Sequence, residues 1–436
     1  MSHGERGRAG RVNMKTIVIS VASVFLLAGC IPFIPEPNGM SPDEFAVFLK
    51  KSSTDQFGVP AIDSINHPGR VAVAVEETLG RLRNKGSDLE RQCSALIPRS
   101  LPVVSTVDAP AGYGLDDRFN AVSNAFKSLG TACFIGDLSA CQQTQSYAMR
   151  WATEAELNRP RGGRHDSVFW NDTLTVNMRL VLPMLSALGI AEERIPMPKS
   201  DRARFDPWVE SIVKINEHMM RQEGRYDPPV SARKAAHNHA MQSSNAYMAL
   251  GAWLGDVDYF ENGLEQWKIT LNSMRGDGSL PIETRRGARA LFYQGRAITA
   301  LTLTAEIASS QGIDLWAWAP SEDKTIHMPV KFLIDALENP NLVFPYARIN
   351  HAPGPSKDWR RQDVASGSTF GWVASYMSRF PEHPNTVRMQ NRVLGVSAVP
   401  ENRLTVHLDS AVKRGGTVGG DWNVVNGRCL FGEGAL

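Results

Sequence analysis

Residues 285–310 read RRGARALFYQGRAITALTLTAEIASS, and this stretch decides the fold because it carries a long α-helical pattern. Its apolar side chains cover much of a helix circumference instead of one stripe, which predicts a helix buried on most sides. They are Leu291, Phe292, Ile298, Leu301 and Leu303. Gly312 follows just past the end, where glycine commonly serves as the C′ residue of a helix.

The beginning of this stretch also carries candidate chemistry. Arg286 and Tyr293 are seven residues apart, close to two helical turns, so we expect them on one face with Arg289 between them. Arg296 extends the same row. Arginine holds carboxylates with paired hydrogen bonds, and nearby positive charge favours the ionised form of a phenol. The row therefore suits a carboxylate-bearing substrate and a proton transfer, although arginines on a helix face are more often solvated or paired with surface carboxylates.

Helical patterns recur along most of the chain and predict an all-α fold. They lie at 116–130, 137–157, 170–189, 206–222, 239–253, 258–274, 285–310, 328–337 and 368–379. Strand-like runs are few, since 71–75 is ambiguous and 404–408 is short. Helix pairs with short connections in a domain of this size favour an α/α toroid.

Two motifs then point to a known family. Residues 277–283 read DGSLPIE and residues 289–293 read RALFY, while Asn238-His239 lies about fifty residues upstream of the arginine row. This combination resembles the alginate lyase family of mannuronate-cleaving enzymes, polysaccharide lyase family five. That family has a DG-x-LP-x-E turn, an arginine-rich helix with RAL-x-Y, and an NNHSYW segment. The resemblance is clear over roughly 230–315 and weaker on either side.

The resemblance implies a fold, a reaction and a site. The fold would be an incomplete α/α toroid with a deep substrate cleft. Independently of the resemblance, we expect neither a cofactor nor a metal. The reaction would be β-elimination on a uronate polymer, most of all alginate. The residues matching Asn238, His239 and Arg286 would neutralise the C6 carboxylate, and the one matching Tyr293 would take the C5 proton, protonate the leaving O4, or both. Further substrate-binding candidates are Arg289, His237 and, in a loop, Tyr113.

This chain departs from the family pattern in two places. Ala240-Met241-Gln242 stands where the family has Ser-Tyr-Trp after the Asn-His, so the aromatic platform for sugar rings is altered and mannuronate specificity is in doubt. The loop at 110–118 contains Tyr113 but lacks the lysine of the family's lid loop. Trp359 and Trp372 are further candidates for the cleft, although tryptophans of helical domains mostly pack in the core.

Other classes of site and function remain open. A glycoside hydrolase on the same architecture would need a carboxylate pair, and Glu283 is the nearest acid, with Arg285 or Arg286 as its expected partner. A non-catalytic polymer-binding protein of exopolysaccharide assembly would need arginines but no phenol. A metal held by His237 and His239 lacks a third ligand at suggestive spacing.

The N-terminus predicts export. Lys15 precedes an apolar run at 17–27, and Leu27-Ala28-Gly29-Cys30 has the form of a lipobox, so 1–29 is the expected signal peptide, with Met14 as an alternative start. Cys30 would carry the lipid, and 30–40 would be a proline-rich tether. Ile31, which is not aspartate, favours the outer over the inner membrane of a Gram-negative cell.

The remaining residues, 41–436, are predicted to form one periplasmic domain, and we expect a monomer. The net charge of +2 offers no general attraction to nucleic acid, so binding of an anionic polysaccharide must depend on a local basic cleft. An even number of cysteines in an exported chain favours disulfides. The candidates are Cys93, Cys133, Cys141 and Cys429, with Cys133 and Cys141 the closest pair and three connectivities open.

Overall fold

The computed structural model describes residues 62–83, 100–110, 114–155, 157, 167–215, 237–320, 324–351, 356–364, 367–393 and 429–430. Within these ranges all regular structure is helical and no strand occurs, as predicted. The signal peptide, Cys30, the tether, Tyr113, Cys93 and the strand-like run at 404–408 lie outside the described residues.

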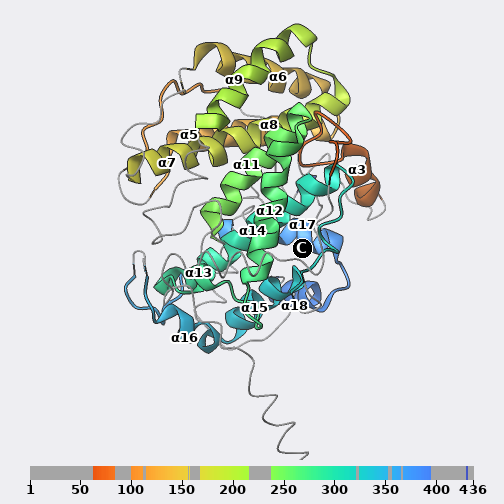
Figure 1. Ribbon diagram of the computed structural model, residues 1–436. Coiled ribbons are helices and arrows are strands. Elements are labelled where there is room, and N and C mark those ends of the chain that lie inside the picture. The colour runs from red at the N-terminus through yellow and green to blue at the C-terminus, as the bar shows by residue number, and fades with distance from the viewer. Residues whose placement is uncertain are drawn as a thin grey trace, which may run out of the picture. The chain divides into compact units, whose positions relative to one another are not determined.

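Several helices follow one another with short connections, at 135–137, 195–198 and 255–256, while longer segments such as 311–326 separate others (Figure 1). The α-helices are α3 (Val75–Arg83), α5 (Arg118–Phe134), α6 (Leu138–Glu154), α7 (Ser167–Val176), α8 (Leu182–Arg194), α9 (Lys199–Ile215), α11 (Asn238–Leu254), α12 (Val257–Ser273), α13 (Pro281–Thr284), α14 (Ala290–Ser310), α15 (His327–Glu338), α16 (Phe344–Ala347), α17 (Val373–Arg379) and α18 (Pro384–Val393). A π-helical turn, η3 (Asn177–Val181), joins α7 to α8, and three 3₁₀ turns are η5 (Gly287–Arg289), η6 (Pro340–Leu342) and η7 (Gly367–Phe370).

Most predicted helices occur close to their predicted bounds, and several segments differ. The predicted helix at 368–379 is divided, because η7 ends at Phe370 and α17 begins only at Val373, and α3 and α18 were not predicted. The pattern beginning at 206 is too late, because α9 already starts at Lys199 and continues through Pro207. The ambiguous run at 71–75 is not a strand but a mostly buried irregular segment with a bend at Ala72, and its last residue, Val75, begins α3. The segment predicted as one helix over 285–310 is interrupted before Ala290, which changes the description of the site given below.

The hairpin of α11 and α12 shows how sequence sets the packing. Gly255 closes α11 in the left-handed region with φ of 79°, and Asp256 caps α12 by accepting a hydrogen bond from Tyr259 N–H at 3.1 Å. A Cβ on Gly251 would lie 2.4 Å from the backbone nitrogen of Phe260. The glycine therefore lets the two helices approach until their backbones touch.

The end of α14 confirms the predicted role of Gly312. Gly312 has φ of 80°, its N–H donates to Ser309 O at 3.0 Å, and the N–H of Ile313 donates to Ala308 O at 3.0 Å. These two bonds form a Schellman motif, which satisfies carbonyls that the helix end would otherwise leave unpaired.

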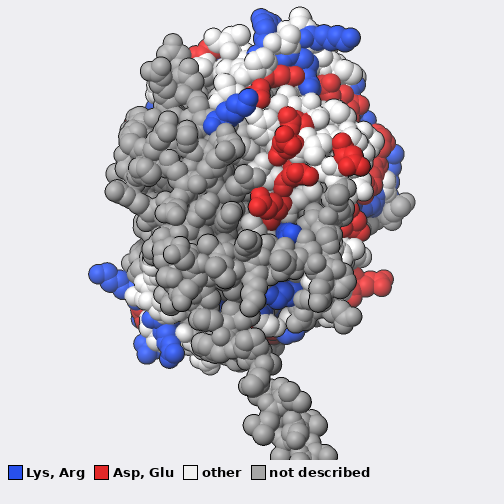
Figure 2. Space-filling view, viewed as in Figure 1, with Lys and Arg blue, Asp and Glu red and all other residues white. Residues whose placement is uncertain are grey.

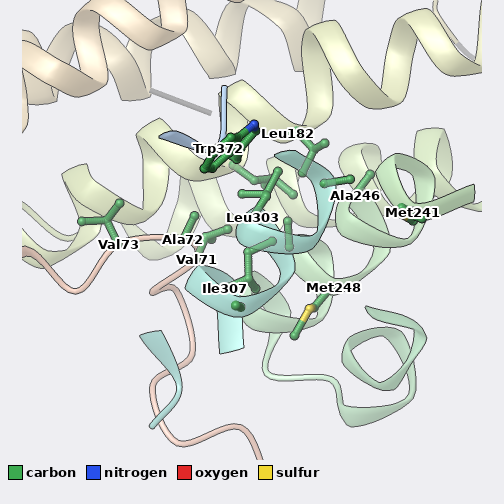
Figure 3. Packing of buried hydrophobic residues seen from close by; sticks show 14 of the residues in the cluster. Val71, Ala72, Val73, Leu182, Met241, Ala246, Met248, Leu303, Ile307 and Trp372 are labelled. Carbon is green, nitrogen blue, oxygen red and sulfur yellow. The ribbon is translucent and has the colours of Figure 1, made fainter. Parts of the chain in front are cut away.

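The core is built around α14. Figure 3 shows Leu303 of α14 near Leu182 of α8 and Trp372, and Ile307 near Val71 and Ala72; all of them belong to one cluster of buried side chains, in which Trp372 is fully buried. Trp372 therefore belongs to the core and not to a sugar-binding surface, as is usual for tryptophan in a helical domain. The position of α14 among its neighbours agrees with the apolar circumference predicted from its sequence.

One stretch of the described chain, Asn171–Arg194, is long and apolar enough to cross a membrane by length and composition. It comprises the end of α7, η3 and α8, and 94% of its 18-residue apolar window is buried inside the protein. Its hydrophobicity is therefore that of a core helix.

One disulfide between the predicted cysteines lies within the described residues. Cys133 and Cys141 form a disulfide across the connection between α5 and α6, with their Cα atoms 4.8 Å apart. Cys429 is also disulfide-bonded. The closest pair in sequence, Cys133 and Cys141, is thus one of the disulfides.

Candidate active site

The first turn of α11 holds two predicted catalytic residues. His237 is the N-cap residue, with extended backbone, and its Nδ1 accepts a hydrogen bond from Ala240 N–H at 3.3 Å. Because the helix begins at Asn238, the rings of His237 and His239 can lie near one another, with centroids 5.9 Å apart. His239 is half-buried and His237 is almost fully buried, so the geometry gives His237 a capping role.

Asn238 is held by a carboxylate that comes from the DGSLPIE turn. Glu283, in the short helix α13, accepts hydrogen bonds from the backbone N–H of Asn238 and from its side-chain Nδ2, the latter at 3.1 Å to each carboxylate oxygen. Both residues are buried. The prediction paired Glu283 with Arg285 or Arg286, and the structure adds Asn238 as its partner. The carboxylate of Glu283 is thus engaged with Asn238, whereas a glycoside hydrolase needs a pair of carboxyl groups free to act on the sugar.

The arginine row is corrected by the structure. Arg286, Arg289 and Tyr293 do not share one α-helix, because α13 ends at Thr284 and a 3₁₀ turn at Gly287–Arg289 precedes α14. Gly287 adopts φ of 57°, a conformation that glycine accepts without strain. The helical pattern in the sequence continues through this turn, which is why it was not predicted.

Despite the break, Arg286 and Tyr293 meet. The guanidinium carbon of Arg286 lies 4.1 Å from the centroid of the Tyr293 ring, and both side chains are buried. A cation over a phenol ring is a stabilising contact, and it fixes the two groups relative to one another. Arg289 is half-buried at the N-terminus of α14.

Glu283 also connects the two halves of the site. The N–H of Arg286 donates to the backbone oxygen of Glu283 at 3.2 Å, while the carboxylate of Glu283 holds Asn238. The segments 237–239 and 286–293, predicted to cooperate, are therefore joined through one residue. From the sequence, Glu283 was considered only as a turn residue paired with Arg285 or Arg286, or as the acid of a hydrolase, and its contact with Asn238 was not predicted.

A further bond joins α11 and α14 beyond the first turn. Gln242 donates from Nε2 to Asn238 Oδ1 at 3.1 Å and accepts at Oε1 from Arg296 at 2.9 Å. Gln242 and Met241 are buried, so in this chain the two positions that are aromatic in the family motif belong to the interior.

The segment 356–364 packs against the arginine turn. Gln362 donates to Gly287 O at 2.9 Å and accepts from Leu291 N–H at 3.1 Å, and the N–H of Asp363 donates to Ala288 O at 2.7 Å. These bonds fix the backbone between Arg286 and α14. Trp359 of the same segment is half-buried against Phe344 and Arg360.

The geometry defines an all-α protein that gathers buried guanidinium groups, an anchored amide and a phenol, a combination suited to a carboxylate ligand and a proton transfer. The model of the alginate lyase family matches residues 118–343, more than half of the 436 residues. The chain therefore belongs to the alginate lyase family.

Individual relatives are distant and cover parts of the chain. It is 26% identical over 250 residues to a polysaccharide lyase of Stenotrophomonas maltophilia, which covers 57% of this chain and 65% of that protein. It is 24% identical over 151 residues to an alginate lyase of Pseudomonas syringae pv. syringae, covering 35% of this chain and 37% of the relative. The chain thus matches less than two thirds of the length of either relative.

Solved structures confirm the fold. Alginate lyase A1-III from Sphingomonas species A1 superposes with a TM-score of 0.54 at 18% identity, covering 74% of this chain and 91% of that one. An alginate lyase from Bacteroides ovatus gives a TM-score of 0.51 at 15% identity, with 78% and 98% covered. At these identities they establish the α/α-toroid fold, which the sequence predicted, and no more.

Proposed function

We propose that this protein is a polysaccharide lyase that cleaves a uronate-containing polymer, with alginate as the leading substrate. The observation that carries the proposal is the buried contact of Arg286 with Tyr293, joined through Glu283 to Asn238. A site that only binds a polyanion needs cations but has no use for a fixed phenol. Membership of the alginate lyase family supports the choice of polymer.

The proposed reaction assigns one task to each group. Asn238, His239 and Arg286 contact the C6 carboxylate and offset the negative charge that builds on it when the C5 proton leaves. Tyr293 takes that proton and returns one to O4 as the glycosidic bond breaks. The electrons of the C5–H bond become the C4–C5 double bond, so no water is consumed. Arg289 contributes a further cation for the substrate, while Tyr113 stays a predicted contact outside the described residues.

The test begins with purified full-length protein and separate solutions of polymannuronate, polyguluronate, glucuronan and hyaluronan. The C4–C5 double bond absorbs in the ultraviolet, so a rise with one polymer would establish elimination and identify the substrate class. New reducing ends without this absorbance would indicate hydrolysis instead. Retained polymer binding without either signal would favour a binding protein of exopolysaccharide assembly.

Two variants test the roles. Tyr293→Phe keeps the ring under Arg286 but removes the hydroxyl, so we expect turnover to fall by about 1,000-fold or more, with polymer binding retained. Arg286→Ala removes a cation that contacts both substrate and Tyr293, so both turnover and binding should weaken. A Tyr293→Phe rate within a few-fold of wild type would contradict the assigned chemistry.

We also propose that the protein is exported and anchored by a lipid on Cys30, at the outer membrane rather than the inner. The support is the lipobox Leu27-Ala28-Gly29-Cys30 and the disulfide between Cys133 and Cys141, a bond typical of oxidising compartments. Cys30→Ser should move the protein from the membrane fraction to the soluble fraction and abolish labelling by a fatty acid. Unchanged fractionation of this variant would rule out the anchor.

A further inference from the structure

A row of hydrogen-bonded side chains links α14 to the first turn of α11 and ends at α13. Arg296 Nη2 donates to Gln242 Oε1 at 2.9 Å, and Gln242 Nε2 donates to Asn238 Oδ1 at 3.1 Å. Asn238 Nδ2 donates in turn to the two carboxylate oxygens of Glu283, each at 3.1 Å. The row therefore runs in one direction, from a cation through two amides to an anion.

Burial makes the direction of this row important. Asn238, Gln242 and Glu283 are 1%, 2% and 0% exposed, so solvent cannot replace a lost partner. A half-turn of the Asn238 amide would bring its oxygen against the carboxylate and its NH₂ against the NH₂ of Gln242. Both bonds would become repulsive contacts, so only one orientation of the amide is stable.

Arg296 determines the orientation of Gln242 in the same manner. A guanidinium group has donors and no acceptor, so Gln242 must turn its oxygen toward Arg296 and its nitrogen toward Asn238. That nitrogen also donates to the backbone oxygen of Asn238 at 3.1 Å. Gln242 is thereby bound at both ends and transmits the orientation from α14 to α11.

We propose that Gln242 and Arg296 are positioning residues, which hold the Asn238 amide so that one N–H of Nδ2 is directed at the C6 carboxylate of the substrate. Asn238 Nδ2 lies 3.1 Å from each oxygen of Glu283, so a single N–H directed between the two oxygens can serve both. We assign the second N–H of the group, for which the described part of the chain supplies no other acceptor, to the substrate. The inference rests on the proposed lyase function. Gln242 occupies the position of the tryptophan in the family motif, so this arrangement is a property of the present chain.

The proposed role has a specific kinetic signature. Negative charge grows on the C6 carboxylate only as the C5 proton departs, so a donor fixed in advance stabilises the transition state more than the bound substrate. Loss of its orientation should therefore lower kcat and leave KM nearly unchanged. If Gln242 and Arg296 had only a structural role, their loss would lower the stability of the protein but would not lower kcat selectively with KM unchanged.

The experiment compares four variants of the full chain on the polymer that the wild type cleaves. Gln242→Leu and Arg296→Met should each lower kcat by about 10- to 100-fold with KM within about 3-fold, the range for loss of one oriented donor. Arg296→Lys keeps a donor and should retain most of the activity. Gln266→Leu replaces an equally buried glutamine on α12 and serves as the matched control, with near wild-type kcat.

A double variant tests whether Gln242 and Arg296 act on kcat through the same amide group. Because Gln242 and Arg296 act through one amide, Gln242→Leu with Arg296→Met should be little worse than either alone. Fully additive losses, or a Gln242→Leu kcat equal to that of Gln266→Leu, would overturn the positioning role while leaving the lyase function intact. Absence of ultraviolet-absorbing product from the wild type on every uronate polymer would overturn both proposals.

Discussion

At the scale of single residues, the surroundings of Glu283 bear on both the stability of the protein and its proposed activity. Its carboxylate is the acceptor for two donors of Asn238, one in the backbone and one in the side chain, and it is shielded from water. A buried acceptor of this kind contributes to stability because its removal leaves buried N–H groups without partners. It also places a negative charge behind the amide that is proposed to face an anionic substrate.

We therefore predict that Glu283→Gln destabilises the protein by about 1–3 kcal/mol and strongly lowers turnover. A glutamine offers one acceptor, and its NH₂ opposes the donors of Asn238. Urea unfolding measures the first effect, with the exposed Glu261→Gln on α12 as a control that should stay within about 0.5 kcal/mol of wild type.

A double variant separates stability from chemistry at this pair. Asn238→Asp combined with Glu283→Gln exchanges acceptor and donor, so part of the lost stability should return. Turnover should not return, because a carboxylate at position 238 would repel the uronate. Recovery of activity together with stability would contradict the proposed contact between Asn238 and the substrate.

At the scale of elements, α15, α17 and α18 meet in a cluster of two histidines and a tyrosine. The rings of His327 and His383 stack with centroids 4.2 Å apart. Tyr376 Oη lies 2.7 Å from Nδ1 of His327, and Asn385 donates to Tyr376 Oη and, through its backbone N–H, to Nδ1 of His383. The Nδ1 atom of His383 thus serves as an acceptor for the Asn385 N–H, which requires this imidazole to be neutral.

Burial and the neighbouring His383 lower the pKa of His327 to about 4, and burial lowers the pKa of His383. A histidine with a lowered pKa in the folded state contributes stability above its unfolded pKa of about 6.5, and that stability is lost as pH falls toward 4. We predict that the free energy of unfolding falls by roughly 1–2 kcal/mol between pH 7.5 and pH 5, allowing for partial exposure.

Urea unfolding at the two pH values measures this loss. His327→Phe removes the titrating ring but keeps an aromatic group in the stack, so its stability should depend less on pH than that of the wild type. The exposed His67→Gln should retain the wild-type dependence. An equal dependence in His327→Phe would show that the cluster is not its source.

The element scale also shows how far sequence could predict this fold. The apolar circumference of 290–310 and Gly312 predicted α14 and its end, since both signals are local. The turn at Gly287 was missed because the flanking arginines and alanines are good helix formers and the tertiary bonds from Gln362 decide the conformation. The bond between Gln242 and Arg296 joins residues 54 positions apart, and no local pattern predicts such a partner.

At the scale of the whole molecule, charge is distributed unevenly although the net value is only +2. Figure 2 shows acidic side chains gathered on one face, and the exposed acids of α12 include Asp258 and Glu261. The arginines of the candidate site are buried or half-buried. Attraction of a polyanion should therefore come from the site itself and not from the overall field.

Charge variants distinguish these two sources. Asp258→Lys with Glu261→Lys raises the formal net charge from +2 to +6, since each reversal adds two charges. At about 0.15 M salt, where the Debye length is about 8 Å, we expect its KM to stay within about 2-fold of wild type. Arg289→Ala removes one charge at the site and should raise KM by about 3- to 10-fold. Arg204→Ala removes the same charge from the exposed surface of α9 and should have no effect on KM.

Measuring the KM of the same variants at low salt provides a second test of where the polymer is attracted. At about 0.01 M the Debye length is near 30 Å, so the distant lysines of the charge-reversed protein should then attract the polymer and lower its KM. The effect of Arg289→Ala should persist at both salt concentrations, because a cation in direct contact with a carboxylate is screened much less. If the charge-reversed protein instead gained affinity equally at both concentrations, the polymer would contact α12 directly, and the substrate path would have to cross the acidic face.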